Sequence, residues 1–154
     1  MQTTLKMKKS YYKIGFAVFL LFVLDVYTKW LATAWLDRPL EITSWFSLVY
    51  SRNFGTAWSL PVPKEIILPL NVVIFVIVAF WLPKALDLRS KHTFIALSLI
   101  FGGALGNIYD RMAFGYVVDF IKVGWWPVFN LADVFLSAGI FIIIVFYGKI
   151  KRHN

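Results

Sequence analysis

The sequence predicts an all-α integral membrane protein with four transmembrane helices and a small extracytoplasmic β element between helices 1 and 2. Three observations support this fold class. Hydrophobic residues make up 60% of the chain, and the mean hydropathy is +0.71. Four apolar stretches are long enough to cross a hydrocarbon core of about 30 Å. A polar and aromatic segment of about 28 residues separates the first two stretches.

The four expected spans cover about residues 13–36, 65–82, 93–109 and 128–148. They have to be helical, because lipid offers no hydrogen-bonding partner to an exposed backbone group. Pro69 lies near the start of the second span, where a missing N–H costs little, and Pro83 is expected to end that span. We expect residues 1–154 to form a single membrane-embedded domain, since the chain shows no linker or repeat.

The first span has a second interpretation, as a secretory signal peptide. The basic segment "KMKKSYYK" precedes the apolar run, and "ATA" at residues 32–34 resembles a cleavage site. Asp25 and Lys29 interrupt this region, and Trp35 follows it directly. These residues favour a retained transmembrane helix.

The segment between the first two spans contains "ITSWFSLVYS", which is β-branched and aromatic enough for one or two short strands. The next letters, "NFG", are typical of a turn in which Asn53 and Gly55 take unusual dihedral angles. Strands at the membrane surface would offer an edge to an extended peptide. A simple loop dipping into the interface remains the alternative.

The charge distribution predicts the orientation of the chain, whose formal net charge is +8. Cytoplasmic loops of membrane proteins are enriched in lysine and arginine. Ten of the sixteen basic residues flank one side of the predicted spans: Lys6, Lys8, Lys9, Lys13, Lys84, Arg89, Lys91, Lys149, Lys151 and Arg152. Both termini are therefore expected in the cytoplasm. Because these residues lie in separate flanks, they do not indicate a nucleic-acid partner.

Polar residues gather at the opposite, outer ends of the spans. They are Asp25, Thr28 and Lys29 in span 1, Asn107, Asp110 and Arg111 in span 3, and Asn130 and Asp133 in span 4, with Asp119 in the connecting loop. Four of the eight acidic residues thus converge near one interface. Charges within a membrane are costly and normally face a cavity and a partner, so this convergence predicts a functional site.

Each group also has a structural interpretation. Asp25 and Lys29 are four positions apart and could simply pair on one helix face. Asp110 could cap a helix end beside Arg111. Asp133 lies inside an apolar run where Asn130 would be the better N-cap, which favours a functional role for Asp133.

Two neighbouring carboxylates indicate hydrolysis without a covalent intermediate, because one can hold a proton while the other activates a water molecule. His92 and His153 fall on the cytoplasmic side, and the chain has no cysteine, so Ser-His triads and His- or Cys-ligated metal sites are not expected. Three alternatives to two-carboxylate hydrolysis stay open. One is a catalytic dyad of Lys29 with Ser51 or Ser59. The others are non-enzymatic: an ion or proton transporter, or a structural assembly factor.

Five motifs together resemble bacterial lipoprotein signal peptidase, the type II or prolipoprotein signal peptidase. They are "DVYTK" (25–29), "NFGTAW" (53–58), "GGALGNIYDR" (102–111), "GYVVDF" (115–120) and "FNLAD" (129–133). The resemblance covers nearly the whole chain and keeps the motif order. Thr56 and Trp58 depart from the small residue and phenylalanine expected there, and only fourteen positions separate Asp119 from Asp133.

The resemblance implies a monomeric aspartyl endopeptidase of the bacterial cytoplasmic (inner) membrane that works without a metal or other cofactor. Its expected partners are membrane lipid and prolipoproteins carrying a diacylglyceryl-cysteine, cut just before that lipobox cysteine near the outer leaflet. Asp119 and Asp133 match the catalytic aspartates. The supporting or substrate-binding residues carried over are Asp25, Lys29, Asn53, Gly55, Asn107, Arg111, Asn130 and Ala132.

The charge distribution yields a testable topology. A reporter that is active only in the cytoplasm, fused after Asn154, is expected to be active in intact cells, because the basic flanks place the C-terminus inside. Activity only from a reporter that requires export would overturn the four-span orientation and move the acidic residues to the wrong side.

Overall fold

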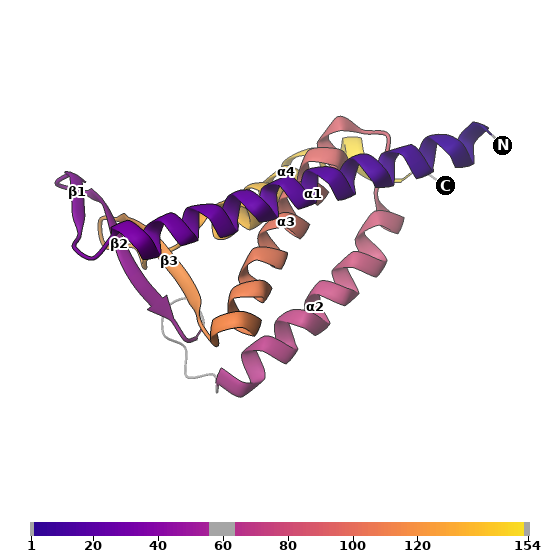
Figure 1. Ribbon diagram of the computed structural model, residues 1–154. Coiled ribbons are helices and arrows are strands. Elements are labelled where there is room, and N and C mark those ends of the chain that lie inside the picture. Colours follow the sequence, from indigo (N-terminus) through magenta and orange to yellow (C-terminus); the bar gives the residue numbers. More distant parts are fainter. Residues whose placement is uncertain (1, 56–63, 153–154) are drawn as a thin grey trace.

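The computed structural model describes residues 2–55 and 64–152 and contains four long helices and one three-stranded sheet (Figure 1). The helices are α1 (Gln2–Trp35), α2 (Lys64–Ala85), α3 (Lys91–Phe114) and α4 (Leu131–Ile150), and the strands are β1 (Leu40–Thr43), β2 (Phe46–Asn53) and β3 (Val117–Val123). Each helix is long and apolar enough to cross a membrane, so the predicted fold class is confirmed. The start of α1 and the end of α4 lie at one end of the bundle, and the sheet lies at the other.

Two helix ends differ from the expected spans in a way that matters for the site. α3 continues to Phe114 and ends at Gly115, whose φ of 78° allows its N–H to bond the carbonyl of Arg111. Asp110 and Arg111 therefore lie inside the helix, and the interpretation of Asp110 as a terminal cap was wrong. Pro83 lies within the last turn of α2, which ends two residues later at Ala85.

α3 is the central helix, because it packs against α1, α2, α4 and β3. Small residues let its neighbours approach closely. A Cβ on Gly103 would overlap the carbonyl of Ala132 in α4, and a Cβ on Gly106 would overlap the carboxylate of Asp25 in α1. Glycine at position 106 thus creates the space that a buried charged side chain occupies.

The sheet has the order β1-β2-β3 with antiparallel pairing throughout. The hairpin of β1 and β2 is the predicted β element, and β3, which follows α3, is a strand that the sequence analysis treated as a loop. In the register of β2 and β3, Ser51 faces Asp119. The other edge of β3 is occupied, because Phe129 exchanges backbone hydrogen bonds with Ile121. This pairing holds β3 beside the start of α4.

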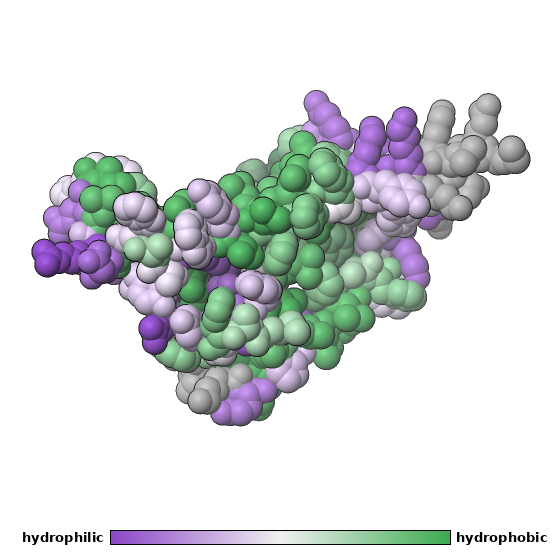
Figure 2. All heavy atoms as spheres, viewed as in Figure 1, coloured by the Kyte–Doolittle hydropathy of each residue, from purple (hydrophilic) through white to green (hydrophobic). Residues whose placement is uncertain are grey.

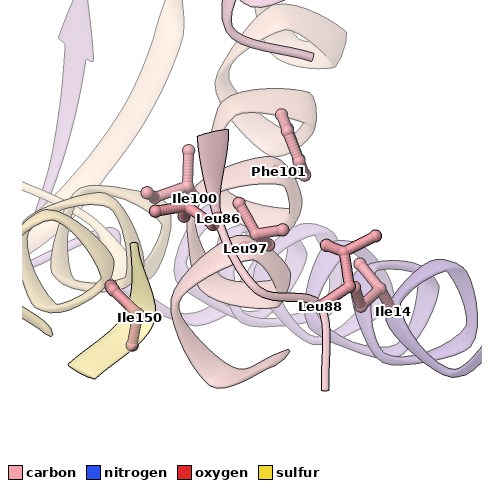
Figure 3. Packing of buried hydrophobic residues seen from close by; sticks show 7 residues of the cluster. All are labelled: Ile14, Leu86, Leu88, Leu97, Ile100, Phe101 and Ile150. Carbon is pink, nitrogen blue, oxygen red and sulfur yellow. The ribbon is translucent and has the colours of Figure 1, made fainter. Parts of the chain in front are cut away.

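The hydrophobic core lies at the end of the bundle away from the sheet. Figure 3 shows its buried side chains, which come from all four helices or their immediate flanks: Ile14, Leu86, Leu88, Leu97, Ile100, Phe101 and Ile150. On the face seen in Figure 2, hydrophobic side chains cover the middle of the molecule and hydrophilic ones gather toward its two ends. This pattern is typical of a protein whose middle contacts lipid.

α2 is the least embedded helix. Among the described elements it packs only against α3, and Figure 1 shows it diverging from α1. Its side chains are largely exposed in the isolated chain, as expected for a helix that faces lipid. The side of α2 toward α4 is therefore left open.

Candidate active site

Asp119 lies on β3 and is almost completely buried, with 2% of its surface exposed. Both of its carboxylate oxygens accept hydrogen bonds from amides. Asn53 Nδ2, at the end of β2, donates to Oδ2 at 2.9 Å, and Asn130 Nδ2 donates to Oδ1 at 2.7 Å. Sheet pairing thus brings Asn53 and Asp119 together although 66 positions separate them.

Asp133 lies in the first turn of α4 and is half-buried. Asn130 is the N-cap of this helix, as the sequence predicted. It forms a capping box in which Asn130 Oδ1 accepts from the Asp133 N–H at 3.0 Å and the Asn130 N–H donates to Asp133 Oδ2 at 3.3 Å. The other oxygen, Oδ1, accepts from Asn107 Nδ2 at 2.8 Å. Asp133 therefore takes part in the cap while presenting a carboxylate to the site.

One asparagine residue connects the two carboxylates: the side chain of Asn130 donates to Asp119, and its backbone N–H donates to Asp133. Because Asn130 Oδ1 faces the Asp133 N–H, its Nδ2 is turned toward Asp119 and also donates to Asn107 Oδ1 at 3.1 Å. The side-chain amide of Asn130 therefore contacts the Asp119 carboxylate and the backbone N–H of Asp133. The structure brings Asp119 and Asp133 into one hydrogen-bonded cluster.

A buried ammonium lies behind this cluster. Lys29 Nζ, on α1, lies 2.7 Å from Asp25 Oδ2 and 3.2 Å from Asp110 Oδ2, and it donates to Asn107 Oδ1 at 3.0 Å. Asp25 and Lys29 do pair on one helix face, as the structural interpretation held. Their interactions extend well beyond that pair, because Lys29 also contacts two side chains of α3.

The two carboxylates around Lys29 also bind backbone groups of other elements. Asp25 Oδ1 accepts from the Ala132 N–H of α4 at 2.8 Å, and Asp110 Oδ2 accepts from the Val118 N–H of β3 at 3.0 Å. We call Asp25, Lys29 and Asp110 the ion cluster. It fixes β3 and α4, the two elements that carry Asp119 and Asp133. A cleaved first span would remove Asp25 and Lys29 from this core, so the geometry favours the retained helix.

Arg111 lies one helical turn beyond Asn107 on α3. Its guanidinium donates to the Asn107 carbonyl at 3.4 Å and to the Gly55 carbonyl at 3.3 Å. Gly55 in turn donates its N–H to Asn53 Oδ1 at 3.0 Å, so the predicted turn is present, although the φ of Gly55 is not positive. Arg111 thus holds the end of β2 near the two aspartates.

An apolar cavity of about 520 Å³ reaches the site from the open side of α2. Asn107, Arg111 and Asp133 form its polar end. Its remaining walls come from α2, α3 and α4: Asn71, Ile74, Phe75, Val78, Leu82, Ile100, Phe101, Ala104, Ile108, Leu136, Ile140, Ile143 and Ile144. An extended or helical apolar segment could therefore approach Asp133 from the lipid without crossing water.

The pKa of Asp119 is raised from its ordinary 3.8 to about 6, mainly by burial and to a smaller extent by the neighbouring carboxylate of Asp133. The amides of Asn53 and Asn130 act in the opposite direction, since they stabilise the ionised form. Desolvation is the largest effect, so Asp119 takes up a proton more readily than an exposed aspartate does.

All ten residues expected at the site belong to this cluster through side-chain or backbone contacts. Asp110 belongs to the cluster as well; the sequence placed it among the converging polar residues but not among these ten. Asn71, the one amide that the apolar run of α2 carries into the cavity wall, was not expected at all. Asn71 could have been found from the sequence as a lone polar residue in an apolar span.

Ser59, Thr56 and Trp58 lie outside the described residues. Ser51 has no hydrogen bond with Lys29, whose Nζ faces carboxylates instead. The Ser51–Lys29 dyad gains no support.

Within residues 2–55 and 64–152, no three His, Cys, Asp or Glu side chains are arranged to hold a metal ion. The carboxylates of the polar cluster instead face amide donors and the Lys29 ammonium. Such an environment suits proton transfer between two acids and a water molecule.

The comparisons with known proteins decide the family. The model described as Signal peptidase (SPase) II matches residues 17–148. The chain belongs to the signal peptidase II family. The lipoprotein signal peptidase of Syntrophomonas wolfei is 37% identical over 144 residues, which cover 88% of this chain and 94% of that protein. The one of Thermodesulfovibrio yellowstonii is 35% identical, covering 95% of this chain and all of its own length.

Solved structures agree with this assignment. A bacterial membrane enzyme solved at 2.3 Å resolution is similar with a TM-score of 0.76 and 28% identity, over 88% of this chain and 87% of its own. A second, solved at 1.9 Å, has a TM-score of 0.70 and 26% identity over 86% of this chain and 90% of its own. Family membership supports a multi-pass membrane protease that removes signal peptides from prolipoproteins.

The ion cluster predicts a large loss of stability in Lys29→Met. The substitution leaves Asp25 and Asp110 buried without their shared cation, and breaking a buried ion pair costs about 3–5 kcal/mol. Thermal unfolding in detergent measures the effect, with Lys84→Met as the exposed control. The triple variant Asp25→Asn, Lys29→Met, Asp110→Asn is expected to be more stable than Lys29→Met alone, and equal or lower stability of the triple variant would contradict the account.

The raised pKa of Asp119 predicts a pH-dependent stability. The unfolded chain loses this proton near pH 3.8 and the folded chain near pH 6, so the contribution is present below pH 3.8 and is lost as pH rises through 6. A shift of this size corresponds to roughly 3 kcal/mol at most. Between pH 4 and 7, wild-type stability should therefore fall relative to Asp119→Asn. Glu41→Gln, which removes an exposed carboxylate, is the control; parallel curves for wild type and Asp119→Asn would refute the shift.

Proposed function

We propose that this chain is an aspartyl endopeptidase that cuts diacylglyceryl-modified prolipoproteins just before the lipidated lipobox cysteine. The observation that carries the proposal is the connection of Asp119 and Asp133 through Asn130 at the polar end of an apolar cavity. Two linked acids supply acid and base catalysis, and the cavity admits a lipid-embedded substrate.

In the proposed mechanism, the two aspartates share one proton. The raised pKa of Asp119 makes it the acid of the pair, and the Asp133 carboxylate removes a proton from a bound water molecule. That water oxygen attacks the scissile carbonyl, while Asp119 gives its proton to the carbonyl oxygen. Collapse of the tetrahedral intermediate breaks the C–N bond. The leaving amine takes the proton held by Asp133, and one hydroxyl group of the intermediate returns its proton to Asp119 as the product carboxyl group forms. No covalent bond to the enzyme forms.

The remaining site residues position these groups. Asn53 and Asn130 orient Asp119, and Asn107 orients Asp133. Arg111 faces the cavity with donors that suit the carbonyl groups of a substrate backbone. Asp25 and Lys29 act one layer further back, because they hold α1, α3 and α4 together, with Ala132 contributing its backbone N–H.

The proposed location follows from the two ends of the bundle. The basic flanks of α1, α3 and α4 lie at the end away from the sheet, so both termini would be cytoplasmic and the aspartates would lie near the outer leaflet of the bacterial inner membrane. In this proposal the whole chain, residues 1–154, acts as a monomeric single domain without a cofactor. The acyl chains of the substrate would stay in the lipid beside the open face of α2.

The competing functions receive less support from the arrangement. A proton or ion conduit needs polar groups along its length, whereas the end of the bundle away from the sheet is filled by Ile14, Leu97 and Ile150. A structural assembly factor has no need for two linked carboxylates, one of which lines a cavity. An aspartyl protease uses both features.

The first test of the proposal replaces each carboxylate by an amide of the same size. Asp119→Asn and Asp133→Asn are each expected to lower the initial rate of lipopeptide cleavage by a factor of about 10⁴ or more, with inhibitor binding retained. The double variant should be no worse than either single one, because half of an acid–base pair has no function. Asp87→Asn, at the opposite end, is the control for charge removal and should be silent. Substantial activity in either folded single variant would show that other carboxylates act.

The second test concerns the lipid on the substrate. Two acyl chains hold a precursor at the depth of the cavity and raise its local concentration, so the unlipidated precursor should be cut at least 100-fold more slowly, an effect on the order of that expected from positioning. Matched lipidated and unlipidated peptides, compared by kcat/KM in the same detergent without added metal, give the answer. Equal turnover would exclude lipid recognition while leaving the two-aspartate mechanism standing.

A further inference from the structure

A second cavity lies at the far end of the molecule from the aspartates. Its volume is about 360 Å³, and it is formed where the α2–α3 connection meets the C-terminal end of α4. Its lining residues are Pro83, Leu86, Asp87, Leu88, Arg89, Lys149, Lys151 and Arg152. Four cations and one acid thus surround a single hollow, which nothing in the peptidase mechanism uses.

The backbone of this cavity is fixed by a short bridge between the two segments. The Asp87 N–H donates to the Ile150 carbonyl at 2.7 Å, and the Arg152 N–H donates to the Ala85 carbonyl at 2.9 Å. Leu86 and Ile150 lie beneath the bridge as part of the hydrophobic core seen in Figure 3, with 2% and 0% of their surfaces exposed. The cavity therefore has a rigid floor, and its cations extend from anchored positions.

The cations of this cavity have no ionic partner within the described part of the chain. The salt bridges found there involve only Lys29, and the side chain of Asp87 accepts the Arg89 N–H at 3.0 Å rather than pairing with a cation. Arg89, Lys149, Lys151 and Arg152 are all exposed. A site with this charge and geometry suits a phosphate group, which accepts hydrogen bonds from several cations at once.

The surroundings favour a lipid as the source of the phosphate. Trp81 and Tyr147 lie one turn or so before the cavity on α2 and α4, with 64% and 57% of their surfaces exposed. Exposed tryptophan and tyrosine near the end of a span mark the depth of lipid headgroups. Lys84 lies over the ring of Phe80 at 3.1 Å from its centroid, which places a further cation at the same level. The cavity thus opens where phosphodiester groups of the adjoining leaflet lie.

We propose that the cavity formed by Arg89, Lys149, Lys151 and Arg152 binds the phosphate of an anionic glycerophospholipid in the leaflet at the cytoplasmic end of the bundle. The enrichment of lysine and arginine in cytoplasmic loops accounts for basic residues at this end of the bundle. It does not account for the convergence of four of them on one rigid cavity. Lys9 and Lys13 lie on α1 at the same end and do not line it. The bound lipid would join α2, α3 and α4. A zwitterionic lipid, whose phosphate lies beside a positively charged choline, would bind the four cations less well.

The test compares two double variants that remove the same charge from the same end of the full-length protein. Wild type, Lys149→Gln with Arg152→Gln, and Lys9→Gln with Lys13→Gln are titrated in detergent with phosphatidylglycerol and with phosphatidylcholine, and thermal unfolding is recorded. Wild type and the α1 variant should show a saturable rise in unfolding temperature with phosphatidylglycerol only. The cavity variant should need roughly thirtyfold more lipid for half of the effect, as expected for two lost cations near a membrane surface.

Three outcomes would overturn the proposal. An unchanged titration in the cavity variant would show that the cavity does not bind the lipid. An equal loss in both double variants would reduce the effect to general charge attraction. A full effect of inorganic phosphate alone, with no further rise on adding phosphatidylglycerol, would identify a soluble phosphate rather than a lipid as the ligand. Peptidase activity is not read in this experiment, so its result is independent of the proposed function.

Discussion

The contact of Lys29 with Asp25, Asp110 and Asn107 is the interaction on which the rest of the site depends. A buried ammonium needs carboxylates and hydrogen-bond acceptors around it, because leaving it unpaired in a dry interior costs several kcal/mol. The acceptors come from two helices, and the same carboxylates bind backbone N–H groups of β3 and α4. The contacts that surround the Lys29 ammonium therefore hold α1, α3, β3 and α4 together at the point where they meet.

The constraint explains features that are otherwise unrelated. Gly106 has to lack a Cβ, because the Asp25 carboxylate occupies that space. α3 has to continue past Asp110, since the helix carries both Asn107 and Asp110 to the ammonium. Asn107 links the ion cluster to the pair of aspartates. Its Oδ1 faces Lys29, which turns its Nδ2 toward Asp133 and leaves one orientation of the amide. The ion cluster thereby sets the geometry of a carboxylate that it does not touch.

Much of this arrangement could be predicted from the sequence. Length and hydropathy were enough for the four spans, and the cost of charges in lipid was enough to expect that acids from distant positions would meet. The pairing of β3 with β2 was not accessible, because Val117–Val123 is short and lacks a regular alternation of polar and apolar residues, and its partners in β2 lie 64 to 77 positions away. Asp110 was misjudged for a related reason. Its partners, Lys29 and the Val118 N–H, become neighbours only after the chain has folded.

Catalysis in the proposed mechanism depends on one proton, which Asp119 holds and gives to the substrate carbonyl while the Asp133 carboxylate accepts another from water. Infrared difference spectroscopy of the purified protein across a pH titration observes that proton directly through the C=O stretch of a protonated carboxyl. We expect wild type to show a protonated-carboxyl band that disappears with a midpoint near pH 6, and Asp119→Asn to lack it. A band near pH 6 that persists in Asp119→Asn, or its absence from wild type at pH 5, would contradict the assignment of the acid.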